Sequence, residues 1–150
     1  MPSKNHAART RASVEKTLTK SGARCTLYFD GGLVDAATGT KTSAPRSVNL
    51  WGLLGSYSAA LVDGKRVQQG DIKVLVADKS LAGLDVAPLA SVVDEQASSG
   101  FWLYLPADPE RFPEPIDPPA PGDRRLSVVR LDGTVHEGGY PVMRVLQCRG

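Results

Sequence analysis

Short apolar runs separated by glycine, aspartate and proline recur along the whole chain, and this spacing is typical of a mostly β protein. The most apolar run covers residues 72–77, and its length and branched side chains favour a buried strand near the centre of a sheet. Further strands are predicted at residues 25–29, 47–53, 101–105, 126–131 and 141–147. These short strands, with turns between them, favour a small β-barrel or a β-sandwich.

Three details complete this fold prediction. A helix is expected over residues 7–20, with Val14 and Leu18 on one face, after a disordered tail of residues 1–6. Asp132-Gly133 is expected to form the turn before the last strand. Core positions are expected to include Trp51, Trp102, Val74 and Val76.

Three segments between the strands are expected to be irregular. Residues 35–45 have almost nothing to bury, so they should form an exposed loop. Residues 57–71 should form a protruding hairpin or a long loop, because Asp63-Gly64 is a turn signal and Gly70-Asp71 stands just before the next strand. Seven of the 11 prolines fall within residues 106–121, which predicts a surface excursion without regular structure.

With 150 residues, of which 41% are hydrophobic, the chain is long enough to bury a core, and residues 1–150 are expected to form one domain. No run approaches the roughly 18 apolar residues of a membrane helix, which excludes a membrane partner. Cys25 and Cys148 are too few for a disulfide framework. The start of the chain has no apolar signal core, so the cytosol is the expected compartment.

Charge is distributed unevenly along the chain. Residues 1–24 carry six Lys or Arg against Glu15 alone, whereas residues 85–122 carry seven Asp or Glu against Arg111 alone. Such poles either steer association with a charged surface or a second copy of the chain, or remain solvated.

The sequence offers no constellation for catalysis, metal binding or a cofactor, so we expect a protein that is not an enzyme. Of the two histidines, His6 falls in the predicted tail and His136 lies beside the exposed turn at 137–139, so neither forms a credible dyad with a Ser or Cys nucleophile. Acidic pairs such as Asp108 and Glu110 should be hydrated. The aromatic residues are not interleaved with Lys or Arg, as a base-stacking surface would require, although Lys65 could touch a phosphate backbone.

Residues 57–77 resemble the central block of head-closure proteins of tailed bacteriophages, in which an aromatic-led segment, an Asp-Gly turn, a Gly-Asp pair and a "kvLvaa" strand follow one another. Other parts of the chain are similar to the same family in the same order. They are the basic helix before residues 22–27, the loop at 35–40, Pro121-Gly122-Asp123 and the strand at 140–146. Together these pieces cover about two thirds of the chain, a coverage that gives such short motifs some weight.

The resemblance implies a structural protein of the virion neck that closes the head after DNA packaging. In that family a small β-barrel joins a ring of copies, commonly a dodecamer, between the portal or adaptor protein and the tail terminator or tail-tube proteins. The loop would face the channel, near packaged DNA and without sequence specificity. The residues that this assigns to the channel and subunit interface are Tyr57, Leu61, Asp63, Gly64, Lys65, Arg66, Val67, Gly70 and Asp71.

One departure and two alternatives accompany this resemblance. About thirty residues between the "kvLvaa" strand and Gly122 have no counterpart in the family pattern, so no role carries over to the acidic, proline-rich segment within 85–122. The chain could instead be a tail-completion or adaptor protein of the same neck. A small nucleic-acid-binding β-barrel, or an unrecognised enzyme, is the alternative from another class of function.

Overall fold

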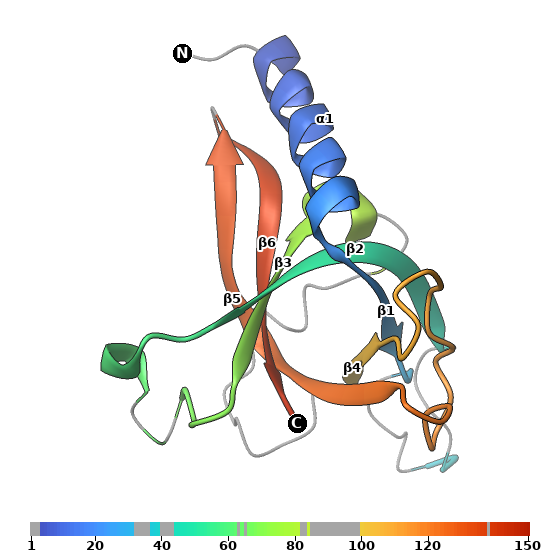
Figure 1. Ribbon diagram of the computed structural model, residues 1–150. Coiled ribbons are helices and arrows are strands. Elements are labelled where there is room, and N and C mark those ends of the chain that lie inside the picture. Colours follow the sequence, from blue (N-terminus) through green and yellow to red (C-terminus); the bar gives the residue numbers. More distant parts are fainter. Residues whose placement is uncertain are drawn as a thin grey trace.

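A computed structural model of the chain describes residues 4–31, 37–39, 44–62, 64, 66–81, 84, 100–137 and 139–150. The protein is mostly β, and the six strands of its described residues close into one antiparallel barrel (Figure 1). Closure gives every strand two hydrogen-bonded neighbours, which removes exposed sheet edges. The prediction of a small β-barrel with a short N-terminal helix is confirmed.

The strands follow the order β1-β2-β3-β6-β5-β4 around the barrel. Their bounds are Ala23–Phe29 for β1, Arg46–Ser56 for β2, Ile72–Ala77 for β3, Phe101–Leu105 for β4, Arg124–Glu137 for β5 and Tyr140–Arg149 for β6. Strands β3 and β4 match their predicted bounds, and β2 extends three residues further than expected. Two short 3-10 helices, η1 at Ala59–Leu61 and η2 at Asp78–Leu81, flank β3.

Alternation along the strands builds the core. In β3, Val74 and Val76 are fully buried while Lys73 and Leu75 point outward, as a strand with one face on the core requires. The buried cluster also contains residues from each of the other five strands, from η2 and from position 84 after it. These residues are Cys25, Leu27, Leu50, Leu81, Leu84, Phe101, Leu103, Leu126, Val128, Leu146 and Cys148.

The helix α1 spans Lys4–Ser21, so the expected disordered tail at residues 1–6 is wrong for residues 4–6. Figure 1 shows α1 standing beyond one end of the barrel, beside the β5–β6 hairpin. Leu18 is buried and Val14 is half-buried, while α1 contacts β2, β3 and β6. The helix forms despite its polarity because this narrow apolar face docks on the barrel.

The predicted turn at Asp132-Gly133 is wrong. These two residues lie inside β5, where the pairing with β6 shifts register between Leu131 and Gly133, and the hairpin reverses instead after Glu137. Such a shift leaves an extra residue in one strand and re-aims its side chains. An Asp-Gly pair therefore marks a β-bulge here, a role that the dipeptide alone does not distinguish from a turn.

The prediction that Trp51 and Trp102 belong to the core is also wrong, since both side chains are half-buried on the outside of the barrel. The guanidinium of Arg24 lies 4.6 Å from the centre of the Trp51 ring, and that of Arg125 lies 4.4 Å from the Trp102 ring. A cation stacked on an indole covers it without burying it in the core.

Residues 106–123 have no helix or strand, as predicted, but they are fastened to the barrel. Thr26 Oγ1 donates a 2.7 Å hydrogen bond to the carbonyl of the buried Pro113. Arg111 lies 3.0 Å from the buried carboxylate of Asp123, which also accepts the N–H of Ala107 at 2.7 Å. The segment is an ordered cover over the outer face of β1 and β4.

Candidate functional site

The described residues of the loop between β2 and β3, residues 57–71, project away from the barrel at the end opposite α1 (Figure 1). Its described tip contains η1, where Ala59, Ala60 and Leu61 are all exposed. The side chain of Leu61 is 56% exposed, the largest exposed fraction among the exposed large hydrophobic residues of the described chain. An apolar tip held away from the core is therefore available to a partner.

The end of the loop that enters β3 is fixed by Asp71, which is buried. Arg149 donates from Nε and Nη2 to the two carboxylate oxygens of Asp71, each at 2.8 Å. The Asp71 carboxylate also accepts the backbone N–H of Gln68 and the side-chain amide of Gln147, both at 2.9 Å. A bidentate guanidinium pair with two further hydrogen bonds satisfies this buried charge.

The other end of the loop is fixed by Tyr57. Its hydroxyl donates a 2.8 Å hydrogen bond to Asp132, and the same carboxylate lies 3.1 Å from the guanidinium of Arg130. Arg130 in turn donates to the side-chain carbonyl of Gln147, which connects this end to Asp71. Both ends of the loop are thus held by one continuous network on β5 and β6.

The β-bulge in β5 explains how this network forms. In a regular ladder, successive side chains alternate between the two faces of a sheet. The register shifts around Arg130, Leu131 and Gly133 break that alternation. The shift between Val128 and Arg130 places Arg130 opposite Gln147 rather than in the core beside Val128, and its guanidinium lies 3.1 Å from Asp132.

Electrostatics support a tight anchor. Burial alone would raise the pKa of Asp71, but hydrogen bonds from Arg149, Gln68 and Gln147 outweigh burial and hold that pKa below its ordinary value. Burial and the hydrogen bond to Asp132 raise the pKa of Tyr57. The carboxylate therefore stays ionised and the phenol stays protonated, the states in which both anchors hold.

The predicted roles of the loop glycines agree with the structure. Gly70 has a φ of +91° and Gly64 has a φ of +76°, both in the left-handed region that favours glycine. The N–H of Gly64 donates to the carbonyl of Val67 at 3.0 Å, which closes a turn at the tip. The N–H of Asp71 donates to the carbonyl of Gln68, also at 3.0 Å.

Other predicted interface residues fare differently. Val67, which the resemblance assigns to the channel and subunit interface, is only 6% exposed within the single chain. Arg66 is exposed, and its carbonyl accepts a hydrogen bond from Gln147. Asp63 and Lys65 lie outside the described residues.

Between the two limbs of the loop is a recess of about 460 Å³. Tyr57 and Ala59 line one side, and Gln69 and Gly70 line the other. The loop therefore has two anchored ends and a middle that its own side chains do not fill. A segment of this kind keeps its position while its tip can still change shape.

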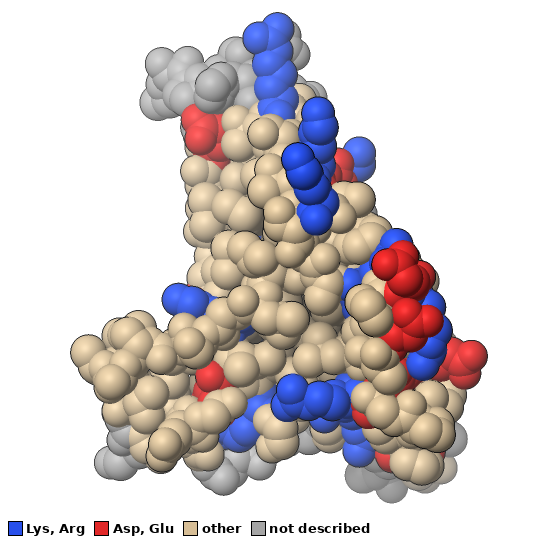
Figure 2. Space-filling view, viewed as in Figure 1, with Lys and Arg blue, Asp and Glu red and all other residues tan. Residues whose placement is uncertain are grey.

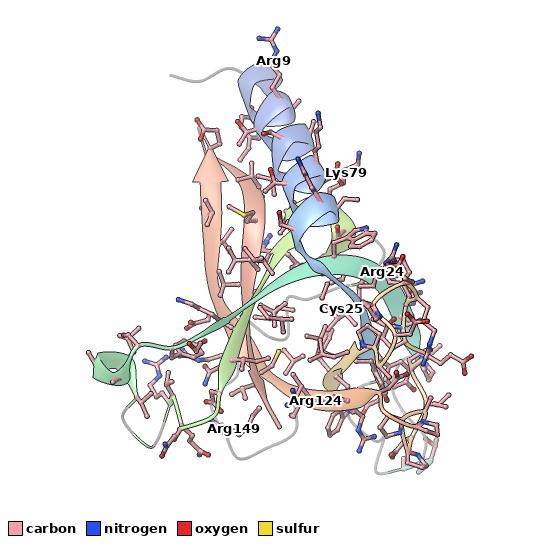
Figure 3. All side chains as sticks on the ribbon, in the orientation of Figure 1. Arg9, Arg24, Cys25, Lys79, Arg124 and Arg149 are labelled. Atoms are coloured by element: carbon pink, nitrogen blue, oxygen red, sulfur yellow. The ribbon has the colours of Figure 1, made fainter. Side chains whose placement is uncertain are left out.

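Sequence reasoning found Asp71, Gly70 and Tyr57 but missed the four residues that hold them. These partners are Arg130, Asp132, Gln147 and Arg149, which belong to the last two strands. Figure 3 shows Arg149 at the lower end of the barrel, next to the limb that enters β3. A weak signal was available, since Gln147 and Arg149 are polar residues that alternate with the apolar Leu146 and Cys148 at the end of the closing strand.

Removing the Tyr57 hydroxyl tests the first anchor. Tyr57→Phe is expected to lower the free energy of unfolding by about 1 kcal/mol, because Asp132 loses a hydrogen bond. Urea denaturation would measure this loss. Tyr140→Phe is the matched control, because Tyr140 is exposed and its hydroxyl has no hydrogen-bond partner in the described chain. If the two changes lower the free energy of unfolding equally, the Tyr57 hydroxyl does not anchor the loop.

The chain also offers little reactive chemistry in its described part. Cys25 and Cys148 are buried free thiols, and no group of three or more His, Cys, Asp or Glu among the described residues is arranged to hold a metal ion. Burial raises the pKa of Cys25 to about 12 and also raises the pKa of Cys148. Of the helix that the structure describes, no part is long and apolar enough to cross a membrane.

Thiol labelling provides a direct check of these two cysteines. At about pH 8, neither thiol is expected to react with an aromatic disulfide reagent in the folded protein, because both are protonated and buried. Both should react at once in concentrated guanidinium chloride. Rapid labelling of either cysteine in the native state would contradict the closed core.

Comparison with known proteins adds no family: no family model, curated protein sequence or solved structure matches this chain.

Proposed function

We propose that this chain is a structural protein of the bacteriophage neck. It closes the head after DNA packaging and joins the head to the tail as a ring of subunits, with the 57–71 loop facing the channel. The observation that carries the proposal is the loop itself. It projects from a closed barrel, both of its ends are anchored on β5 and β6, and its exposed 3-10 helix η1 is apolar.

A stopper needs such an arrangement for a physical reason. A ring places the same loop from each subunit around one axis, so small motions of the tips open or close the channel. The motion stays confined to the tip because the Asp71–Arg149 pair and the Tyr57–Asp132 hydrogen bond fix the ends. The order of the sequence segments that resemble head-closure proteins supports the same assignment.

The partners follow from this role. The ring would contact the portal or adaptor protein on the head side and tail terminator or tail-tube proteins on the other. Exposed Leu61 is suited to a neighbouring subunit, since an apolar side chain gains free energy when another surface covers it. Packaged DNA would lie in the channel. The protein would be present in the host cytoplasm during assembly and in the neck of the finished virion.

Deleting the gene from a phage or prophage that encodes this chain tests the role. Electron microscopy is expected to show DNA-filled or leaking heads beside separate, finished tails. A tail-completion protein would instead leave shortened or unfinished tails, which selects that alternative. Intact tailed particles in normal number would contradict every neck assignment.

One observation favours a second candidate, a nucleic-acid-binding barrel. Figure 2 shows Lys and Arg side chains along α1, and Arg9, Lys16 and Lys20 are exposed there. Phosphate contacts of this kind give an affinity that falls steeply with salt. Two results together would select this candidate. Duplex DNA binding would persist in a variant with a shortened 57–71 loop, and deletion of the gene would leave intact virions.

A further inference from the structure

A second recess lies where α1 joins the barrel, and it has an apolar floor. Its volume is about 510 Å³, and it extends from the last turn of α1 to the start of β5. Trp51, Leu54, Leu105 and Pro106 contribute apolar surface, and Leu54 is 42% exposed. An exposed leucine beside an indole offers a partner free energy from apolar burial.

The rim of this recess is basic. Lys20 and Arg124 line it and are exposed, and neither has an ion-pair partner within the described part of the chain. Arg24 is already held by the Trp51 ring, by the carbonyl of Pro109 and by Glu110 at 3.8 Å. Among the described residues Glu110 is the only acidic one that lines the recess, so this part of the rim has a positive excess.

The same chain presents a segment of complementary chemistry. Residues 114–117, Glu-Pro-Ile-Asp, form a short turn on the proline-rich segment, with Glu114, Ile116 and Asp117 exposed. Ile116 is 44% exposed, and the Glu114 carboxylate is exposed without an ion-pair partner among the described residues. We name this segment the acidic knob.

The acidic knob is held rigidly. On one side Pro113 is fixed by Thr26 through a 2.7 Å hydrogen bond, and on the other Asp117 pairs with Arg125 at 2.9 Å. Between them the N–H of Ile116 donates to the carbonyl of Glu114 at 2.9 Å, which closes a tight turn. A knob ordered before it binds loses little conformational entropy when it docks.

We propose that the acidic knob of one copy docks in the basic recess of the next copy. Ile116 would cover the floor near Trp51 and Leu54, and Glu114 would approach Lys20 and Arg124. A knob and a recess are unlike surfaces, so the contact is head-to-tail and can generate a ring when the rotation closes. The inference rests on the proposed function for its ring and deepens it by naming the subunit contact.

Two full-length variants isolate one such contact. The knob variant, Glu114→Ser with Ile116→Ser, keeps its recess, while the recess variant, Lys20→Glu with Arg124→Glu, keeps its knob. Each alone is expected to be a monomer, and their mixture should form a one-to-one pair by analytical ultracentrifugation. Wild-type chain at the same concentration should form larger species, because each copy can use both surfaces.

The two tryptophans report which surface is engaged. In a ¹⁵N-labelled knob variant mixed with the unlabelled recess variant, the indole N–H signal of Trp51 should shift and that of Trp102 should not. With the labels exchanged, Trp102 should respond instead, because Arg125 links its ring to the knob. Signal dispersion in each variant verifies that it is folded.

Matched charge changes test the rim. Adding Lys20→Glu and Arg124→Glu to the labelled knob variant should abolish the pair, for the same reason that the recess variant alone is expected to be a monomer. Adding Arg9→Glu and Lys16→Glu makes the same change in net charge on exposed α1 positions outside the recess, and should change the affinity less than about twofold.

The absence of any Trp51 shift at about 1 mM chain, where even a millimolar contact is half formed, would overturn the inference. An equal shift caused by an unlabelled chain that lacks the knob would overturn it as well. Neither result bears on the proposed role in the phage neck, because gene deletion tests that role separately. If the pair forms but the deletion leaves normal virions, the contact stands and the neck role fails.

Discussion

Replacing Asp71 with alanine is expected to lower the free energy of unfolding by about 3 kcal/mol. The change leaves Arg149, whose side chain is 21% exposed, without its bidentate partner, and it removes one hydrogen bond from the fully buried Gln147. Breaking a buried pair costs more than the pair contributes, because one charge stays desolvated. Because Arg149 is partly exposed, the expected loss of unfolding free energy is at the lower end of the range for breaking a buried ion pair. Guanidinium denaturation would measure it.

Asp108→Ala is the control for this change. Asp108 is exposed, and its carboxylate accepts only the N–H of Glu110 among its described contacts. Its loss is expected to cost about 0.5 kcal/mol. Similar losses from the two alanine variants would mean that Asp71 does not anchor the loop.

The pH dependence of stability gives an independent readout of the same anchor. The pKa of Asp71 in the folded protein is below its ordinary value of 3.8. A carboxyl group with a depressed pKa adds stability that is fully present above its unfolded-state pKa and is lost as the pH falls through the folded-state pKa. The difference in unfolding free energy between wild type and Asp71→Asn should therefore be constant above about pH 5 and shrink below about pH 4.

Replacing Gly70 with valine is expected to abolish assembly while leaving a folded monomer. Gly70 has a φ of +91°, which a β-branched residue resists at a cost of about 1–3 kcal/mol. Nothing lies within 4 Å of the position that a Cβ would occupy, so strain in the backbone, rather than a clash, drives the change. The loop should leave its present path, and tailed particles should fail to form when this variant complements the deletion.

Gln69→Val provides the matched control, since it places the same side chain one residue earlier at an exposed position without a positive φ. It should support normal assembly. Normal assembly by Gly70→Val, or complete unfolding of that variant, would show that the conformation of Gly70 is not what the loop depends on.

Strand positions were predictable from the sequence because branched and aromatic runs bounded by turn residues report local preferences. Strands β3 and β4 match their predicted bounds for this reason. The errors arose where distant residues decide the outcome. Asp132-Gly133 became a bulge because it is paired along a continuous hairpin, and Trp51, which alternates with the buried Leu50 and Gly52, is covered on the outer face by Arg24.

The residues of the candidate site likewise fall into two groups, those that local sequence predicts and those that only the fold brings together. Gly70 and Asp71 were predictable because a turn needs a positive φ and because a nearby carboxylate can accept local N–H groups. Arg149 was not, since it lies 78 positions away and reaches Asp71 only once β3 and β6 pair. The acidic knob was likewise hidden, because charge and proline content predict an exposed segment but not the hydrogen bond from Thr26 that fixes it.

Reconstitution of the joint tests the central claim most directly. Heads and tails accumulated without this chain would be mixed with the purified protein, and retained DNA and tailed particles would be counted by electron microscopy. The account predicts that the protein alone restores both, and that the joined particles show a ring of new density between head and tail. Heads that lose their DNA and remain tailless after its addition would contradict the claim.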